Sequence, residues 1–420
     1  MNLSILGSKL RDQLHKFSGK LSTHFSKPMQ RFVEQMLYGI QASQDVKLSC
    51  IGRTLEEEIP LIKTEERLSR NLDHEGLEKE LHRQVAKVGS RYVREDTYVL
   101  VDPSDITKPY AEKMEYLATV RDGSQKELAE GYWLCCVVAA ELESHRVVPL
   151  YKALYSAEAP DFESENHEIL RGIDTVREAA KTRGIYVMDR GGDREKLLVP
   201  FLERAMRFIV RLKGDRHLFF RGARRVAVDL AHGCPRHYNT TVVRENKGKE
   251  TVYDLSFGFR KVTLPGREEV LYLVVVDGFG ETPLLLLTNV SLKKTYKSLW
   301  QVVGGYLTRW RIEETIRFWK QSYNVEDIRV LTYRRLRNMI ALVLASCFFA
   351  AVRLGEDVKL TILACRVKRL SKRLFGVVGF HYYALADGVA HVLRRTGHGP
   401  QCGPPPRDPP DLQLVLFDDS

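Results

Sequence analysis

The chain has 420 residues, of which 44% are hydrophobic and 28% charged, a composition typical of a globular protein with more than one domain. Lys and Arg number 65 against 54 Asp and Glu, and this net charge of +11 favours a polyanionic partner over an acidic small molecule. Its 7 cysteines form no Cys-x-x-Cys pair, which argues against a zinc site or a disulfide framework and favours the cytosol.

Two segments bear on membranes and export. The segment Met1–Leu21 has no continuous apolar core of the kind that a signal peptide needs. The longest apolar run, Met339–Val352, is too short to span a bilayer and is predicted to be a buried helix. We therefore expect no membrane partner.

Residues 1–95 are predicted to form a helical region. Apolar residues recur at helical spacing in Pro28–Gln41, Leu55–Ile62 and Leu77–Val88, and no alternating strand pattern competes with them. The segment Thr64–Asn71 is predicted to be a capped helix start with basic residues on one face, which suits a DNA groove. A plain helical subdomain with solvated charges is the alternative.

Residues 96–213 are predicted to form an α/β domain. Strands are expected at Tyr98–Asp102, Glu115–Arg121, Tyr132–Ala140, Val147–Tyr151, Ile185–Met188 and Phe208–Leu212, with helices at Glu163–Arg183 and Asp193–Met206. Hairpin strands followed by helix, strand, helix and strand is the order of a ribonuclease H-like domain. The predicted fold class is thus α/β, with a ribonuclease H-like catalytic domain.

Two aspartates close predicted strands of this domain. Asp102 and Asp189 each follow an apolar strand, and ligands bind at the carboxyl ends of strands in open α/β sheets. Asp193 is explained as the N-cap of the next helix, whereas Asp189 is either a ligand or a turn residue. Pro103 is expected to end the first strand, which leaves Asp105 in a turn.

Residues 214–297 return to the strand pattern and are predicted to be an all-β insertion. Its strands are expected at Thr251–Phe259, Lys261–Leu264, Val270–Val276 and Pro283–Thr288. Basic residues cluster at its entrance: Arg207, Arg211, Lys213, Arg216, Arg221, Arg224 and Arg225. The cluster is predicted to contact DNA phosphates, and a solvated rim is the alternative.

Residues 298–355 are predicted to complete the catalytic domain with a helix over 306–320. At about 100° per residue, Tyr306, Arg309, Glu313 and Lys320 fall within a stripe roughly 60° wide. A carboxylate among cations and a phenol suits a site that holds a metal ion and a phosphate together. An amphipathic surface helix with an Arg309–Glu313 ion pair is the alternative.

The C-terminal part is predicted in two pieces. Residues 356–400 are expected to form a basic helical region that includes Arg366–Arg373. Residues 401–420 are rich in proline and are expected to be a disordered tail.

These motifs together resemble a known family. An aspartate closing a first strand, Asp189-Arg-x-x-Asp193, a β insertion and Tyr306-x2-Arg309-x3-Glu313-x6-Lys320 resemble the DDE transposases of bacterial insertion sequences, specifically insertion sequence family four. The resemblance runs from about 98 to 352. In such proteins the first aspartate is often followed closely by Thr or Ser, which Asp102-Pro-Ser104 satisfies, although Asp105 is a nearby competitor.

The resemblance implies specific roles. The catalytic residues and metal ligands would be Asp102, Asp189 and Glu313, which would hold two Mg²⁺ or Mn²⁺ ions. Tyr306, Arg309 and Lys320 would bind DNA phosphates, and Arg211 of the basic cluster is predicted to join them. The helical residues 1–95 would bind DNA.

The function implied is that of a DNA transposase. Such a metal-dependent polynucleotidyl transferase cuts double-stranded DNA at terminal inverted repeats and joins the 3′-hydroxyl to target DNA, as a homodimer in the synaptic complex. Its location would be the bacterial cytoplasm, at the nucleoid. Two alternatives remain: a non-transposing nuclease of the same fold, and a transposase-derived DNA-binding repressor or inhibitor without catalysis. The presence of all three carboxylates argues against the repressor.

Overall fold

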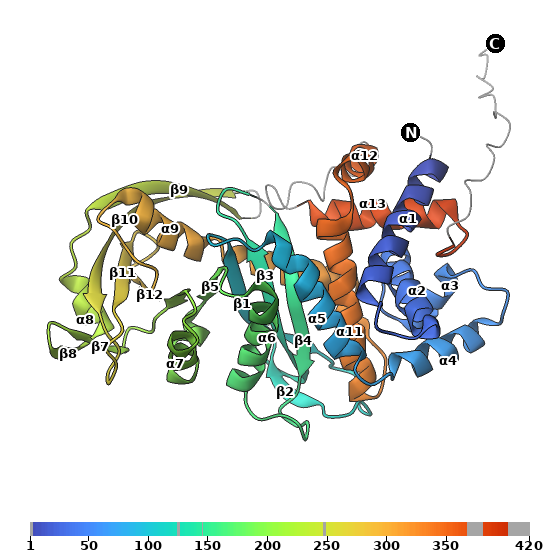
Figure 1. The fold of residues 1–420 in the computed structure, drawn as a ribbon, viewed down its shortest axis with the longest axis horizontal. Helices are drawn as coiled ribbons and strands as arrows, with labels where there is room; N and C mark the ends of the chain where they lie inside the picture. The colour runs from blue at the N-terminus through green and yellow to red at the C-terminus, as the bar shows by residue number, and fades with distance from the viewer. Residues whose placement is uncertain (1–2, 124–126, 145, 247–248, 368–380, 402–420) are drawn as a thin grey trace, which may run out of the picture.

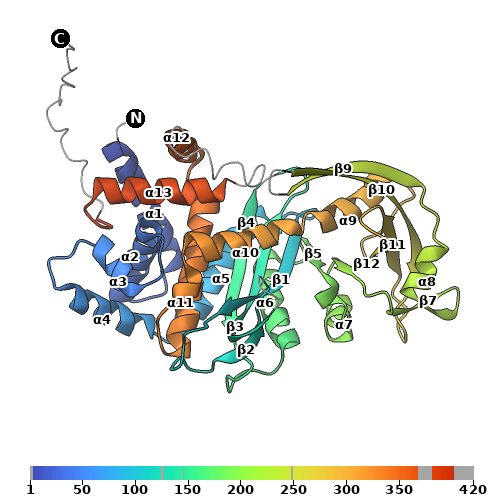
Figure 2. The ribbon, with the colours of Figure 1, turned by 180° about the vertical axis from the view of Figure 1, so that it is seen from behind.

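A computed structural model describes residues 3–123, 127–144, 146–246, 249–367 and 381–401. The molecule is elongated, with helices gathered at one end and a strand-rich region at the other (Figure 1). Between them lies the central part of a long mixed sheet, seen from behind in Figure 2. The predicted tail from 402 onward and most of the predicted basic segment Arg366–Arg373 lie outside the described residues.

The N-terminal region is helical, as predicted. Its helices are α1 (Leu3–Leu21), α2 (Lys27–Ser43), α3 (Leu48–Thr54), α4 (Leu61–Leu72) and α5 (Leu77–Gly89), followed by the 3₁₀ turn η1 (Ser90–Tyr92). The prediction of a helix over Leu55–Ile62 is wrong, because Pro60 disfavours helical geometry in the residue before it and α4 starts only after it. The predicted helix start at Thr64 is also wrong, since Thr64 lies inside α4.

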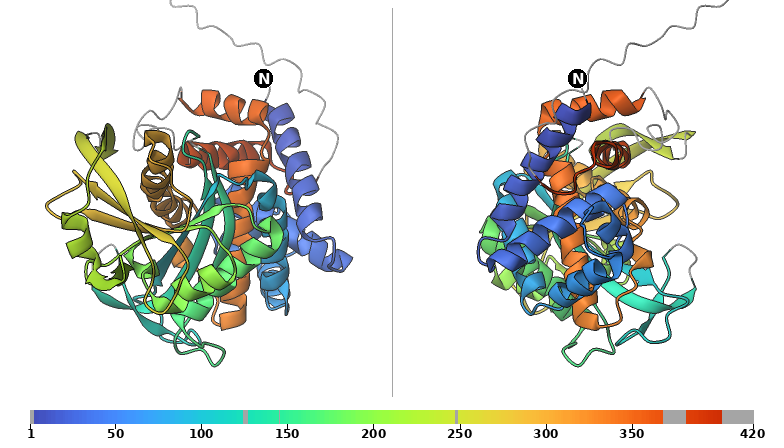
Figure 3. Two further views of the ribbon diagram at one scale, coloured as in Figure 1. Left: turned by 60° about the vertical axis from the view of Figure 1, so that its left-hand side comes forward. Right: turned by 90° about the vertical axis from the view of Figure 1, so that its right-hand side faces the viewer.

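The C-terminal helices pack on this N-terminal region (Figure 3). They are α11 (Tyr333–Phe348), the π-helical turn η4 (Phe349–Arg353), α12 (Glu356–Val367) and α13 (Tyr382–Thr396). Phe17 of α1 stacks on Phe348 with ring centroids 5.8 Å apart. Arg11 of α1 donates a hydrogen bond to Thr396 at the end of α13. The N-terminal helices and the described C-terminal helices therefore share one core.

The segment Tyr333–Arg353 is long and apolar enough to cross a membrane by length and composition. However, 83% of its most apolar window is buried inside the protein. Gln41 of α2 donates to the carbonyl of Ser346 in this segment at 2.7 Å. Its burial is that of a core helix, as predicted for Met339–Val352.

The α/β region follows the predicted element order. Its strands are β1 (Tyr98–Thr107), β2 (Ala118–Arg121), β3 (Leu128–Ala140), β4 (Val147–Tyr155), β5 (Ile185–Met188) and β6 (Phe208–Arg211), with helices α6 (Glu165–Ala180) and α7 (Glu195–Glu203). β1 runs antiparallel to β3 and parallel to β5, and β5 runs parallel to β6. Helix α6 covers one face of the sheet in Figure 1, and Figure 2 shows α10 (Trp310–Ser322) on the other.

The first strand is longer than predicted. β1 pairs with β3 from Tyr98 to Thr107, so Pro103 does not end it and Asp105 lies in the strand rather than in a turn. β5 pairs with β1 only from Tyr98 to Leu100. Beyond Leu100 that edge of β1 has no β5 partner, so a proline without an amide donor is tolerated there.

The last four strands of the segment 214–297 extend the same sheet, and its first two strands form a separate two-stranded sheet. The segment comprises β7 (His217–Phe220), β8 (Ala223–Val226), α8 (Ala227–His232), β9 (Tyr238–Asn246), β10 (Lys249–Val262), β11 (Leu271–Asp277) and β12 (Leu284–Thr288). The all-β prediction is wrong because of α8, which is too short to give a periodic pattern. β12 pairs with β6, giving the strand order β2-β3-β1-β5-β6-β12-β11-β10-β9.

The predicted single helix over 306–320 is divided. Helix α9 (Tyr296–Leu307) ends before a turn at Thr308 and Arg309, and α10 begins at Trp310. The turn is tightened by a bond from the Arg309 amide to the carbonyl of Tyr306 at 3.0 Å. The Thr308 hydroxyl also donates to the carbonyl of Gly304 at 2.9 Å, a contact that bends helices. Tyr306 and Glu313 thus lie on different helices.

Candidate active site

Asp102 lies where β1 leaves its neighbour β5, and its side chain is 15% exposed. Burial raises the pKa of Asp102 to about 7, the Arg309 guanidinium acts in the opposite direction, and the carboxylates of Asp189 and Glu313 add to the rise. Asp189 and Glu313 therefore lie close enough to Asp102 for their charges to affect its pKa. The three carboxylates come from β1, from the residue after β5 and from α10.

Asp189 also has a local structural role. It caps the 3₁₀ turn η2 (Arg190–Gly192), where its Oδ1 accepts a hydrogen bond from the Gly191 amide at 2.7 Å. The prediction offered a ligand and a turn residue as alternatives, and the turn contact is present. A carboxylate fixed in this way stands at a defined position beside β1.

Asp193 is not the predicted N-cap. Arg194 occupies that position of α7, whereas Asp193 is buried and accepts hydrogen bonds from the Lys213 amide at 2.7 Å and from Arg216 Nε at 2.6 Å. A buried carboxylate needs such partners. Arg216 is therefore held by Asp193, and Arg207 of the same basic cluster pairs with Glu95. The predicted phosphate-binding cluster is thus divided among different contacts.

Arg309 lies between two of the candidate carboxylates. One of its terminal nitrogens is 3.6 Å from Oδ1 of Asp102, and the other pairs with Oε1 of Glu313. The ion pair Arg309–Glu313 was the alternative interpretation of this helix, and it is present together with the contact to Asp102. Burial disfavours the guanidinium charge, but Asp102 and Glu313 outweigh burial and raise the pKa of Arg309.

The donor atoms fit a hard divalent cation, since all three candidates offer carboxylate oxygens. The positions of the three carboxylates in the structure do not fit a bound divalent cation. Within the described ranges, no three His, Cys, Asp or Glu side chains gather closely enough to hold a metal ion. The positive charge that Asp102 and Glu313 share is the guanidinium of Arg309. Arg309 thus occupies one oxygen of each of these two carboxylates.

Lys320 has different partners from Arg309. Its Nζ is 3.1 Å from Oδ2 of Asp105 and 3.2 Å from Oε1 of Glu326. Asp105 is buried and also accepts from the Gly123 amide at 3.3 Å. The predicted stripe is thus divided into a group around Arg309 and a group around Lys320. The division distinguishes Asp102 from Asp105: of these two aspartates, Asp102 forms an ion pair with Arg309 and Asp105 forms one with Lys320.

A cleft of about 390 Å³ opens beside Arg309. Three predicted site residues, Arg211, Tyr306 and Glu313, line it together with Arg309. Its wall also includes three aromatic side chains that sequence reasoning did not select: Tyr253, Phe279 and Trp310. Tyr253 and Trp310 lie in strand and helix patterns, where a single aromatic looks like a core residue, and Phe279 lies in a glycine-flanked turn, so no sequence signal distinguished them. Cations beside aromatic rings suit the phosphates and bases of a nucleic acid strand.

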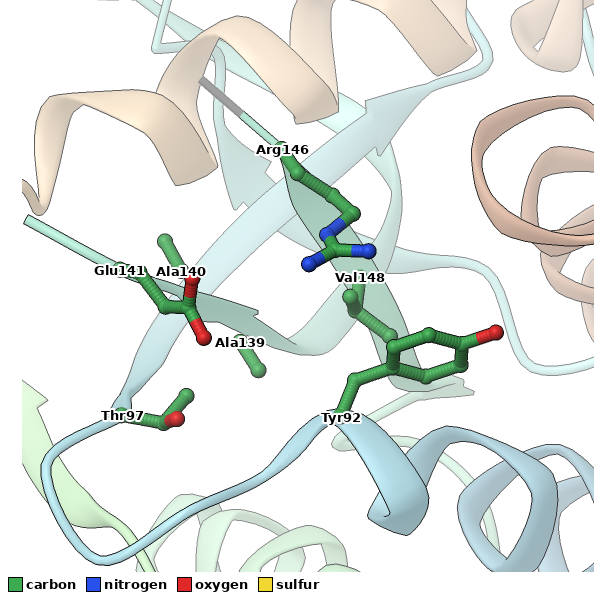
Figure 4. A pocket seen from close by; sticks show the side chains of 7 residues that line it. All are labelled: Tyr92, Thr97, Ala139, Ala140, Glu141, Arg146 and Val148. Atoms are coloured by element: carbon green, nitrogen blue, oxygen red, sulfur yellow. The ribbon is translucent and has the colours of Figure 1, made fainter. Parts of the chain in front are cut away.

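Two other pockets of the described residues contain none of the predicted site residues. Figure 4 shows a pocket near the start of β1 where Arg146 extends over the ring of Tyr92, with its guanidinium carbon 5.3 Å from the ring centroid. Its volume is about 10 Å³, enough for about one water molecule. A roomier pocket of about 660 Å³ lies after β1, where Lys108 donates to the carbonyl of Ile328 at 3.0 Å.

Comparison with known proteins gives a family model and solved structures, among them a transposase complex. No curated protein matches this chain. The cryo-EM structure of a piggyBac transposase synaptic complex with hairpin DNA aligns with 93% of this chain and 85% of that chain, at 11% identity and a TM-score of 0.41. Similarity at that level does not establish a shared fold. Residues 145–349 match the family model of the transposase DDE domain, a segment that contains Asp189 and Glu313 and supports a DDE transposase.

Proposed function

We propose that this protein is a DNA transposase of the insertion sequence family four type, which cuts DNA at element ends and joins the 3′-hydroxyl to target DNA. The observation that carries the proposal is the pair of contacts by which Arg309 joins Asp102 to Glu313, with the charge of Asp189 acting on Asp102. Asp189, Arg309 and Glu313 lie inside the segment that matches the transposase DDE domain. The strand order β4-β3-β1-β5-β6 supports a ribonuclease H-like core.

The proposed roles follow from the chemistry of the side chains. Asp102, Asp189 and Glu313 would hold two Mg²⁺ or Mn²⁺ ions, which when bound would supply an activated oxygen nucleophile and neutralise charge on the leaving oxygen. Arg309 and Arg211 would bind phosphate oxygens in the cleft, and the Tyr306 hydroxyl would donate to them. Lys320 would bind a phosphate on the far side, positioned by Asp105.

The other regions would serve DNA binding and assembly. In this proposal 96–213 and 298–355 form the catalytic core, 214–297 is an insertion that extends its sheet, and 1–95 and 356–400 are helical regions that contact DNA. The DNA partners are terminal inverted repeats and target DNA, held by a homodimer in the synaptic complex. The location proposed is the bacterial cytoplasm, at the nucleoid.

The test uses the DNA that flanks the gene. Inverted repeats bracketing the gene would be placed on a linear substrate, and cleaved ends and joined products would be measured for the wild type and for Asp189→Asn. We expect the wild type to give both products and the variant to give neither. Cleavage without joining would instead identify a nuclease, and tight binding to the repeats without cleavage would identify a repressor.

A further inference from the structure

Arg309 holds a position that a metal ion would need. It lies at the turn between α9 and α10, its side chain is 18% exposed, and it contacts carboxylates from two separate elements, Asp102 on β1 and Glu313 on α10. A guanidinium and a hard metal ion bind the same lone pairs of a carboxylate. The guanidinium lies against Oδ1 of Asp102 and Oε1 of Glu313, so a metal ion bound through these two oxygens would have to displace it.

We infer that Arg309 is a resident cation that keeps Asp102 and Glu313 from binding metal until a DNA phosphate draws the guanidinium into the neighbouring cleft. The inference rests on the proposed function and extends it. It makes DNA binding the first step and metal loading the second, so that cleavage chemistry is confined to protein that already holds DNA.

The cleft supplies the alternative position for Arg309. It adjoins the guanidinium, has a volume of about 390 Å³ and is also lined by Arg211 and Tyr306. Phosphate and carboxylate oxygens accept the planar guanidinium fork in the same bidentate manner. An entering phosphate therefore offers Arg309 an equivalent partner, and the carboxylates it leaves become available to a divalent ion.

The same helix contains a matched control. Arg317 of α10 pairs with Glu314 at i,i+3, as Arg309 pairs with Glu313 at i,i+4, and its side chain is 55% exposed. Arg317→Gln removes the same charge from the same helix without touching Asp102 or Glu313. A general effect of net charge on metal affinity would appear equally in both variants.

The experiment measures Mn²⁺ binding rather than activity. Free Mn²⁺ would be titrated by electron paramagnetic resonance in DNA-free wild type, Arg309→Gln and Arg317→Gln, with thermal unfolding as a check on folding. We expect Arg309→Gln to bind Mn²⁺ about tenfold or more tightly than the wild type. Arg317→Gln should match the wild type. Adding duplex DNA should raise wild-type affinity toward that of Arg309→Gln.

Two further outcomes separate this inference from the proposed function. Equal Mn²⁺ affinity of DNA-free wild type and Arg309→Gln would overturn the inference, and it would leave the transposase proposal intact if DNA cleavage still required Mn²⁺. If the tighter Mn²⁺ binding of Arg309→Gln is lost in the double variant Arg309→Gln, Asp102→Asn, the ion binds at Asp102. Failure of every form to bind Mn²⁺, with and without DNA, would overturn both.

Discussion

Asp102 and Asp105 lie three positions apart on one strand and have different partners. Asp102 contacts Arg309, whereas Asp105 contacts Lys320 and the Gly123 amide. We therefore expect Asp102→Asn to abolish DNA end cleavage and Asp105→Asn to retain it at a reduced rate, because only the position of Lys320 is disturbed. Cleavage in Mn²⁺ on a terminal-repeat substrate measures both. Near-normal cleavage by Asp102→Asn with loss in Asp105→Asn would transfer the catalytic role to Asp105.

The pKa of Asp102 predicts a pH-dependent stability. It is raised from 3.8 to about 7 in the folded, metal-free protein, so the folded state binds this proton more tightly than the unfolded state does. The free energy of unfolding that protonation of Asp102 contributes therefore falls as pH rises from about 4 to about 7. The fall is at most about 1.4 kcal/mol for each unit by which the pKa of the folded state exceeds that of the unfolded state. Denaturant unfolding in chelator should show Asp102→Asn gaining stability over the wild type across this range. A gap that does not change with pH would contradict the assignment.

At the scale of single residues, the sequence identified the candidate site residues but not the contacts that they make. Asp102, Asp189 and Glu313 were selected from strand ends and helix spacing, and in the structure Arg309 joins Asp102 to Glu313 while the charge of Asp189 acts on Asp102. The bridge from Arg309 to Asp102 could not be predicted, because it joins β1 to a helix more than two hundred residues away along the chain. The contact between Lys320 and Asp105 was missed because Pro103 was expected to end the strand.

At the scale of elements, the junction of α9 with β1 sets the position of Arg309. A Cβ added to Gly305 of α9 would lie 2.2 Å from the Tyr98 ring, which is held by a bond from its hydroxyl to the carbonyl of Gln301 at 2.7 Å. We expect Gly305→Ala to destabilise the protein by about 1–3 kcal/mol. Gly19→Ala, at an exposed position of α1 with no atom within 4 Å of the added Cβ, should stabilise it by about 0.5–1 kcal/mol.

Denaturant unfolding of the two glycine variants measures this difference directly. Equal effects at the two glycines would mean that α9 does not approach β1 as closely as the structure indicates. The predicted continuous helix over 306–320 missed the turn at Thr308 and Arg309. Both residues keep right-handed helical backbone angles, so the helical pattern of the sequence continues through the turn.

Short apolar strands bounded by clear turn or helix signals were predicted best. β5 coincides with the predicted Ile185–Met188, because a short apolar run between a helix and a loop allows few alternatives. The segment 214–297 was predicted less well. Sequence periodicity marks strands but does not say which strands pair, so the pairing of β12 with β6 could not be foreseen.

At the scale of the whole molecule, the charge of +11 predicts salt-dependent DNA binding. If Z phosphates are neutralised, the logarithm of the binding constant should fall against the logarithm of salt concentration with a slope of about −0.9Z. Fluorescence anisotropy with duplex DNA over a range of salt concentrations gives this slope. Affinity that does not change with salt would contradict binding through phosphates.

Arg211→Ala should reduce the magnitude of this slope by about 1, because one phosphate contact is lost.

The central claim is that Asp102, Asp189 and Glu313 act through divalent ions to cut and join DNA. The most direct measurement follows end cleavage and strand joining by purified protein on a substrate with the flanking repeats, in Mg²⁺, in excess chelator and after Mg²⁺ is restored, for the wild type and Glu313→Gln. We expect both products from the wild type with Mg²⁺, their loss in chelator, their return with restored metal, and neither product from Glu313→Gln. Cleavage that persists in excess chelator, or in Glu313→Gln, would contradict the account.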